Sequence, residues 1–318
     1  MNLKASDFDL GQYPQTGKYR LNVAVDESAS LPLLLVRGVS DGPVLLVSAC
    51  VHGDEYEGVR AIFEVFEQID AAQLRGNLLM APVVNVPAFW SGTRNSPVDG
   101  VNLARVFPGQ EEGTVSERVA FAFARFLIAR ASFYLDLHSG GIRFRMPSMV
   151  GYRSTDVQAR AAAEIFGARV IWSHPRVDPG RTVSVADQLG IPWLYTEARG
   201  AGRIHPDDLS MMKNGIVNLM RHLKMLPGEC KRTEITHRLS GDGNTDAGVS
   251  ATKPGFLVTQ VGILDEVNAG QLLGTLVDIL GEPVEEYRAP ATGVIGLVRE
   301  FPVVQAGDSL FLIAERER

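Results

Sequence analysis

The sequence predicts an α/β fold with a largely parallel sheet flanked by helices, followed by a small C-terminal β domain. From about Leu33 to Leu223, short apolar runs alternate with longer segments of helical period, which indicates alternating strands and helices. Each run is apolar nearly throughout, as expected for strands of a sheet covered on both faces. After Leu226 the chain becomes polar and glycine-rich, and then continues in short strand-like runs without helical period.

The individual elements follow from these patterns. The expected strands are the apolar runs 44–51, 77–85, 132–138, 168–172 and 192–198. The first expected helix lies between the first two strands, where apolar residues recur at the spacing of one helical stripe, at Val59, Ile62, Phe63, Phe66 and Ile69. A second helix is expected to begin with Ser116 as its N-cap, and two more are expected over 155–166 and 206–224.

The change in texture places a domain boundary within 226–245, and we divide the chain into 1–230 and 231–318. In the second part, "EVNAGQLLG" is echoed by "VVQAGDSLF", which favours a β barrel built from two related halves. Such a barrel resembles the barrel-sandwich domains that carry biotin or lipoate. Those carriers need a lysine on an exposed hairpin, and no lysine follows Lys253. We therefore expect a structural or pocket-edge module without a prosthetic group.

Composition excludes several classes of function. The 318 residues are 45% hydrophobic and 21% charged, which is typical of a globular chain. A net charge of -6 offers no basic face, so nucleic acid is not an expected partner. No apolar stretch is long enough to cross a membrane and the first residues lack a signal peptide, so we expect a cytoplasmic protein. Cys50 and Cys230 lie far apart, which argues against a disulfide framework or a cysteine metal site.

Two strand ends carry residues that can bind a metal. The stretch "SACVHGDEYEG" places His52 and Glu55 three residues apart, directly after an apolar run and across a turn that contains Gly53. Imidazole and carboxylate are zinc ligands, and a catalytic zinc site usually takes three protein ligands. His138 in "YLDLHSGG" ends another apolar run and is the best third ligand. Asp136, two residues earlier, either supports His138 or is an ordinary buried acid.

Two other features have competing interpretations. The pair His205 and Asp208 repeats the spacing of the first motif, but Pro206 between them indicates a helix start. The segment "GVSDG" over 38–42 matches the nucleophile pattern of serine hydrolases. It lies between two strand-like runs rather than before a helix, so we interpret it as a hairpin turn.

Charged residues in a long loop and at a strand end complete the candidate site. The loop 91–109 contains Arg94 and Arg105, which either bind an anionic substrate or are solvated. Glu197 in "YTEARGAG" ends an apolar strand. It is either a general base and acid or the ion-pair partner of Arg199.

Together, "HGDE", "GTR", "NLARVFPG", "DLHSGG" and "TEARG" resemble the succinylglutamate desuccinylase/aspartoacylase family over nearly the whole chain. The resemblance implies a zinc carboxypeptidase-like fold with a mixed sheet, a zinc-dependent hydrolase domain over 1–230 and cleavage of small N-acyl amino acids. It also implies one zinc ion per chain and the following site residues: His52, Glu55 and His138 as ligands, Glu197 to activate water, Arg94 to polarise the carbonyl, and Asn102 and Arg105 to bind substrate.

One position departs from the family pattern. Ala104 stands where family members usually have an asparagine that helps to hold the substrate carboxylate. We therefore expect weak activity on N-acetylaspartate and succinylglutamate and better activity on a differently charged substrate, such as an acetylated diamino acid. Arg143 and Arg145 either supply replacement charge or lie on the surface, which we favour.

Two alternatives remain at this stage. A zinc carboxypeptidase that acts on peptides would share the metal chemistry, and a non-catalytic binding or carrier protein would need none of it. The sequence leaves the acyl group, the native metal and a homo-oligomeric state open.

Overall fold

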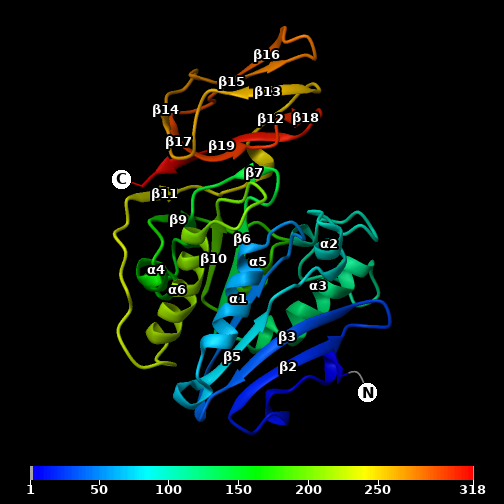
Figure 1. The fold of residues 1–318 in the computed structure, drawn as a ribbon, viewed down its shortest axis with the longest axis vertical. Helices are drawn as coiled ribbons and strands as arrows, with labels where there is room; N and C mark the ends of the chain where they lie inside the picture. Colours follow the sequence, from blue (N-terminus) through cyan, green and yellow to red (C-terminus); the bar gives the residue numbers. More distant parts are fainter. Residues whose placement is uncertain (1–2, 318) are drawn as a thin grey trace.

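A computed structural model describes residues 3–317 of the chain, and a long mixed sheet runs through it (Figure 1). In sheet order, the strands of the body are β1 (Leu3–Lys4), β2 (Gly17–Ala24), β3 (Ser30–Arg37), β5 (Arg75–Ala81), β4 (Ser40–Ala49), β6 (Phe133–Ser139), β10 (Trp193–Ala198), β8 (Met149–Arg153), β9 (Val170–His174) and β11 (His237–Ser240). The central strands β5, β4, β6 and β10 are mutually parallel, whereas β3 and β8 pair antiparallel with their neighbours β5 and β10. The predicted mixed, largely parallel sheet is thereby confirmed.

The turn over 38–42 differs in one respect from the prediction. It joins two strands, as expected, but β3 and β4 do not pair with each other because β5 lies between them. The interpretation as a hairpin was therefore wrong. The reason is long-range: β5 pairs with both strands and separates them, and no local pattern reports such an insertion.

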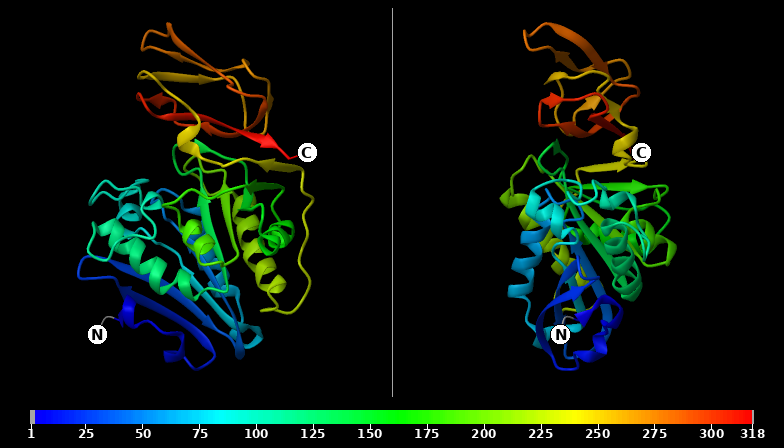
Figure 2. Two further views of the ribbon diagram at one scale, coloured as in Figure 1. Left: turned by 180° about the vertical axis from the view of Figure 1, so that it is seen from behind. Right: turned by 90° about the vertical axis from the view of Figure 1, so that its right-hand side faces the viewer.

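Helices cover both faces of the sheet (Figures 1 and 2). The helices α1 (Glu57–Gln68), α4 (Val157–Phe166) and α6 (Pro206–His222) pack on one face in one hydrophobic core. The helices α3 (Val115–Phe126) and α5 (Thr182–Gln188) pack with the N-terminal strands in a second core on the other face. The short α2 (Val86–Ser91) follows β5.

The start of α3 corrects a second expectation. The N-cap is Thr114 rather than Ser116, which already lies inside the helix. Thr114 accepts a hydrogen bond from the backbone of Glu117, whose side chain in turn accepts one from the backbone of Thr114. This reciprocal capping box satisfies two N–H groups at once. The predicted start of α6 at Pro206 is confirmed, with His205 as its N-cap.

The C-terminal β module consists of two packed sheets around a core of its own. Its strands are β12 (Val249–Ser250), β13 (Gly255–Thr259), β14 (Glu266–Val267), β15 (Leu272–Val277), β16 (Pro283–Arg288), β17 (Gly293–Arg299), β18 (Val303–Val304) and β19 (Ser309–Arg316). The two echoed segments form equivalent units, β14–turn–β15 and β18–turn–β19, each with a glycine of positive φ in its turn, Gly270 and Gly307. The two related halves that the sequence predicts are therefore present.

Two strand pairs join this module to the body. The strand β11 pairs with β9 of the body on one side and with β19 on the other, so the long sheet continues into the module. The short β7 (Phe144–Arg145) pairs with β17. The division at residue 230 stays a prediction, and the chain remains in the body's sheet as far as β11.

Candidate active site

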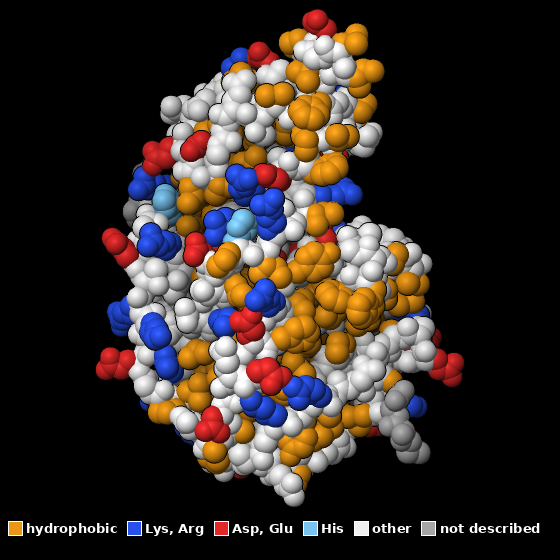
Figure 3. Space-filling view, viewed as in Figure 1, with side chains coloured by type: hydrophobic (Ala, Val, Ile, Leu, Met, Phe, Trp, Pro, Cys, Tyr) orange, Lys and Arg blue, Asp and Glu red, His pale blue; other side chains and the backbone are white. Residues whose placement is uncertain are grey.

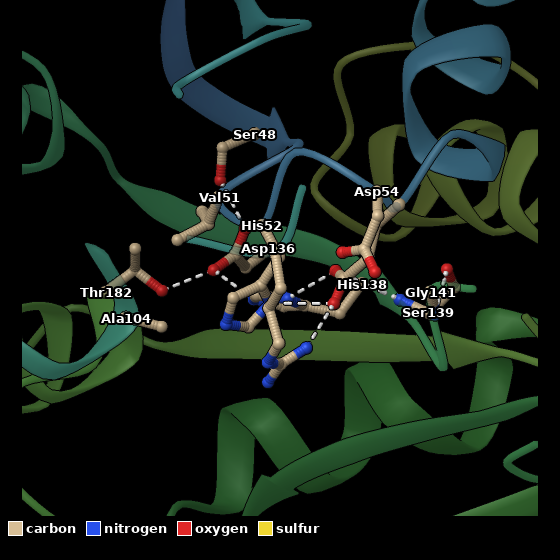
Figure 4. A network of polar contacts seen from close by, with 12 residues as sticks. Ser48, Val51, His52, Asp54, Ala104, Asp136, His138, Ser139, Gly141 and Thr182 are labelled. Carbon is tan, nitrogen blue, oxygen red and sulfur yellow. Dashed lines mark hydrogen bonds and ion pairs between the residues drawn. The ribbon is translucent and has the colours of Figure 1, made fainter. Parts of the chain in front are cut away.

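The three predicted metal ligands meet at one edge of the sheet. His52 and Glu55 lie in the turn after β4, and His138 lies near the end of the parallel neighbour β6. Glu55 bridges the histidines: Oε1 lies 2.7 Å from His52 Nδ1, and Oε2 lies 2.9 Å from His138 Nδ1. The ligand atoms of the three residues lie within 4.8 Å of one another, close enough for one ion. Figure 4 shows this cluster.

The turn that carries His52 and Glu55 has a left-handed residue at its start and packs closely against the backbone of α2. Cys50, which precedes the turn, has a φ of 56°, a left-handed conformation that costs a non-glycine residue about 1 kcal/mol or more. A Cβ atom on Gly53 would lie 2.1 Å from the backbone of Ala88 in α2, so only glycine fits between His52 and Glu55.

Electrostatics of the cluster suit a cation. Burial and, to a lesser extent, the nearby Arg94 lower the pKa of His52 to about 4, so its imidazole is neutral and offers a lone pair. Burial alone would raise the pKa of Glu55, but His52 and His138 hold it below its usual range. Burial would lower the pKa of His138, but Asp136 and Glu55 raise it well above its usual value. A metal ion would therefore compete with a proton at His138.

Asp136 supports His138 directly. Its Oδ2 lies 2.9 Å from His138 Nε2, on the side of the ring away from Glu55. Ser48 donates a 2.6 Å hydrogen bond to the same carboxylate, and the Thr182 hydroxyl donates another (Figure 4). Asp136 therefore fixes the ring so that Nδ1 points toward Glu55, which decides between the two interpretations that the sequence left open.

Glu197 lies beside His138, because β10 pairs with β6 in parallel and these two residues are in register. Among the described residues, no hydrogen-bond partner reaches its buried Oε2. Burial raises the pKa of Glu197 to about 8. The ion pair with Arg199 that the sequence left open is absent from residues 3–317, since Arg199 binds Asp208 at 3.1 Å. An unpaired buried carboxylate at this position indicates a functional group rather than a structural one.

The two loop arginines have different partners. Arg94 Nη1 lies 3.2 Å from Glu55 Oε1, next to the histidines. Arg105 Nε donates a 2.9 Å hydrogen bond to Asp246, which comes from the segment before the β module. Asn102 caps the short turn at Leu103–Arg105 by accepting from the Ala104 N–H, and its predicted role in binding substrate stays a prediction.

These groups share a pocket of about 110 Å³. Its lining includes His52, His138, both loop arginines and Glu197. It also includes these residues that the sequence analysis did not select: Trp172, His174, Arg176, Asp178, Arg181, Thr182, Trp193, Tyr195, Asp242, Gly243 and Thr245. Arg143 and Arg145 are not among the lining residues. Both are exposed, and Arg145 pairs with Glu300 of the β module at 2.7 Å, so the surface interpretation was correct.

His174 is the clearest residue that the sequence analysis missed. Its Nδ1 donates to the carbonyl of Gly241 at 2.8 Å, so Nε2 accepts from the Tyr195 hydroxyl, also at 2.8 Å. Burial lowers the pKa of His174 to about 4, which keeps the ring neutral. Like His52 and His138, it follows an apolar strand, and this shared pattern could have identified it.

The surface carries charges of both signs. On the face drawn in Figure 3, acidic and basic side chains are interspersed over the body rather than gathered in one basic field. Within residues 3–317, no helix has the length and apolar character needed to span a membrane.

Comparison with known proteins adds a family and several relatives. The model of the succinylglutamate desuccinylase/aspartoacylase catalytic domain matches residues 41–223. The N-alpha-acetyl-L-2,4-diaminobutyric acid deacetylase of Halomonas elongata is 32% identical over 314 residues, which are 95% of this chain and 91% of that protein.

Solved structures extend the likeness to the whole fold. The product-bound ectoine utilization protein EutE (DoeB) from Ruegeria pomeroyi superposes with a TM-score of 0.86 at 26% identity, over 95% of this chain and 96% of that one. A succinylglutamate desuccinylase/aspartoacylase from Rhodobacter sphaeroides gives the same TM-score and identity over 98% of both chains. These structures cover the body and the β module together.

Proposed function

Because the chain belongs to the succinylglutamate desuccinylase/aspartoacylase family, we propose that it is a zinc-dependent deacylase of small N-acyl amino acids. The resemblance first drawn from the sequence motifs is thus confirmed at the level of the family. The observation that carries the proposal is the convergence of His52, Glu55 and His138 beside the unpaired carboxylate of Glu197.

His52, Glu55 and His138 would hold one zinc ion per chain. Two imidazoles and a carboxylate are a common catalytic donor set and leave a coordination position open. Bound zinc lowers the pKa of a water ligand and polarises a carbonyl oxygen. Asp136 keeps the His138 ring oriented for this task, because its carboxylate accepts from the opposite ring nitrogen.

Glu197 would handle the protons. In its ionised form, the Glu197 side chain next to the ligands can accept a proton from the attacking water and deliver it to the leaving amine. Arg94 would stabilise the oxyanion that forms at the scissile carbonyl, since its guanidinium already reaches the ligand Glu55. Arg105, which also lines the pocket, would bind the substrate carboxylate.

The pocket favours a small substrate. Its volume of about 110 Å³ and the residues Asp242, Gly243 and Thr245 along its lining leave little room for an extended peptide. This argues against the carboxypeptidase alternative. The curated relative removes an acetyl group from a diamino acid, and we propose an acetylated diamino acid as the substrate of this chain.

The test is a substrate screen with zinc-loaded protein, in which release of free amine is measured. The panel contains N-acetylated diamino acids, N-acetylaspartate, succinylglutamate and C-terminal dipeptides. We expect cleavage of the N-acyl amino acids and loss of activity after chelation, restored by zinc. Cleavage of dipeptides alone would establish the carboxypeptidase, and no cleavage by zinc-replete protein would support a binding protein.

A further inference from the structure

A short segment of the chain closes one side of the pocket. Residues 241–247, here called the strap, connect β11 of the body with β12 of the module. The Thr245 carbonyl accepts a hydrogen bond from Ser309 of the module at 3.2 Å, and the Gly241 carbonyl accepts one from His174 of the body. The strap is therefore fixed from both sides.

Every second residue of the strap meets a pocket arginine. Asp242 lies 3.7 Å from Arg176, and the Asn244 side chain accepts a 3.4 Å hydrogen bond from Arg181. Asp246 accepts the 2.9 Å hydrogen bond from Arg105. The arginines alone would make this side of the pocket strongly cationic, and the strap, together with Asp178, which binds Arg181 at 3.1 Å, offsets much of that charge.

Arg105 and Asp246 retain unused groups. The described residues engage Nε and Nη1 of Arg105 but not Nη2. The carboxylate of Asp246 uses Oδ2 for Arg105, and its side chain remains 62% exposed. Hydrogen bonding to Arg105 lowers the pKa of Asp246, so this carboxylate is ionised at neutral pH. A donor and an acceptor of opposite charge are thus adjacent: Arg105 lines the pocket, and Asp246 lies behind it, next in sequence to the lining residue Thr245.

We propose that Arg105 and Asp246 form a clamp for a zwitterionic substrate. This inference rests on the proposed deacylase function and names its selectivity. Arg105 donates to the carboxylate of the N-acyl amino acid, and Asp246 accepts from a free ammonium group elsewhere on the same molecule. A substrate with a second carboxylate would place that anion against Asp246, where like charges repel.

The test uses Asp246→Asn, which keeps an oxygen acceptor for Arg105 and removes the charge. Two substrates of similar size are compared: Nα-acetyl-2,4-diaminobutyrate, which has a free ammonium group, and Nα-acetyl-2-aminobutyrate, which has none. We expect KM for the first to rise about 10-fold with little change in kcat, because one partly exposed charged hydrogen bond is lost. KM for the second should change less than about 2-fold on the same argument.

Controls separate this role from a structural one. Asp246→Glu should restore much of the preference for the diamino substrate. Asp41→Asn removes an exposed carboxylate paired with Arg37 at the far end of β4 and should leave both KM values unchanged. If KM rises equally for both substrates in Asp246→Asn, or changes for neither, the clamp is contradicted.

Failure of the clamp can be distinguished from failure of the proposed deacylase function. If wild-type zinc-loaded protein cleaves Nα-acetyl-2-aminobutyrate as well as it cleaves the diamino substrate, the deacylase function stands and the clamp is contradicted. Protein that cleaves neither removes the deacylase itself. If Asp246→Asn is too unstable for kinetics, calorimetry measures the binding of 2,4-diaminobutyrate and of 2-aminobutyrate to wild type and to Asp246→Glu. Binding of 2,4-diaminobutyrate that is no tighter than binding of 2-aminobutyrate contradicts the clamp.

Discussion

The pocket has two sides, one with the proposed metal ligands (the ligand side) and one formed by Arg105 and the strap (the strap side), which differ in burial and in the elements that carry them. On the ligand side, His52, Glu55 and His138 sit at the ends of neighbouring strands, and their side chains are at most 13% exposed. On the strap side, Arg105 and Asp246 come from a loop and a linker, and the Asp246 side chain is 62% exposed. Buried groups on a sheet are held rigidly, whereas exposed ion pairs exchange partners easily.

This difference assigns chemistry to one side and selectivity to the other. A reaction needs groups held within fractions of an ångström, which strand ends and the Asp136 network provide. Selectivity can reside in exposed charges, since these can be changed without disturbing a core. Changes on the ligand side should therefore affect metal and kcat, and changes on the strap side should affect KM.

The largest effect is expected for His138→Ala. The change removes one proposed ligand and leaves Asp136 without its partner. We expect loss of most bound zinc, measured by elemental analysis, and a fall in activity on the order of 10³-fold or more, as expected when metal stabilisation of several kcal/mol is lost. Full zinc retention would remove His138 from the site.

A second change on the same side should separate metal from turnover. Glu197→Gln keeps the shape of the side chain and removes its ability to accept a proton. We expect normal zinc content and a kcat lower by on the order of 10²-fold or more, the usual contribution of a general base. Turnover close to wild type would mean that another group accepts the proton.

On the strap side, Arg105→Ala should raise KM rather than lower kcat. Loss of a charged hydrogen bond to the substrate carboxylate predicts an increase of about 10- to 100-fold in KM. Arg145→Ala is the control, because Arg145 is also an arginine paired with a carboxylate but does not line the pocket. A comparable KM change in both variants would show that the effect is not one of substrate contact.

The contrast between the two sides also decides what the sequence could predict. Five strands of the body and the three proposed ligands could be predicted because apolar runs and strand-end histidines are local patterns. The insertion of β5 between β3 and β4 was missed, because strand order depends on contacts between distant segments. The strap was missed for the same reason: Asp246 and Arg105 are 141 positions apart in the sequence and meet only in the folded chain.

Gly243→Ala tests whether the strap must lie where it does. Gly243 has a φ of 63°, and a Cβ atom there would lie 2.7 Å from His174 Cε1. We expect a loss of about 2 kcal/mol in the free energy of unfolding, from backbone strain and from displacement of the buried ring, together with a higher KM. Gly281→Ala is the control, since Gly281 has a φ of 83° but no atom within 4 Å of the added Cβ. If the free energy of unfolding falls no more than in Gly281→Ala, the strap can shift to accommodate the added methyl group.

The smallest effect concerns His174, which joins the body to the strap. Tyr195 and the Gly241 carbonyl contact the two ring nitrogens, and Asp242 and Arg181 are the nearby charges, of opposite sign. Burial lowers the pKa of His174 to about 4, below the ordinary value of 6.5. The unfolded chain therefore binds a proton more readily than the folded one, so this stability is complete above pH 6.5 and decreases as the pH falls toward 4.

The size of the effect follows from linkage. With these two pKa values, lowering the pH from 8 to 5.5 should reduce the free energy of unfolding by about 1.4 kcal/mol through this residue alone. Chemical denaturation of wild type and His174→Asn at both pH values isolates the contribution, because all other titrating groups are common to the two proteins. The wild type should lose about 1.4 kcal/mol more than the variant between the two pH values. Equal losses would mean that His174 binds a proton as readily in the folded protein as in the unfolded chain, so that burial does not lower its pKa.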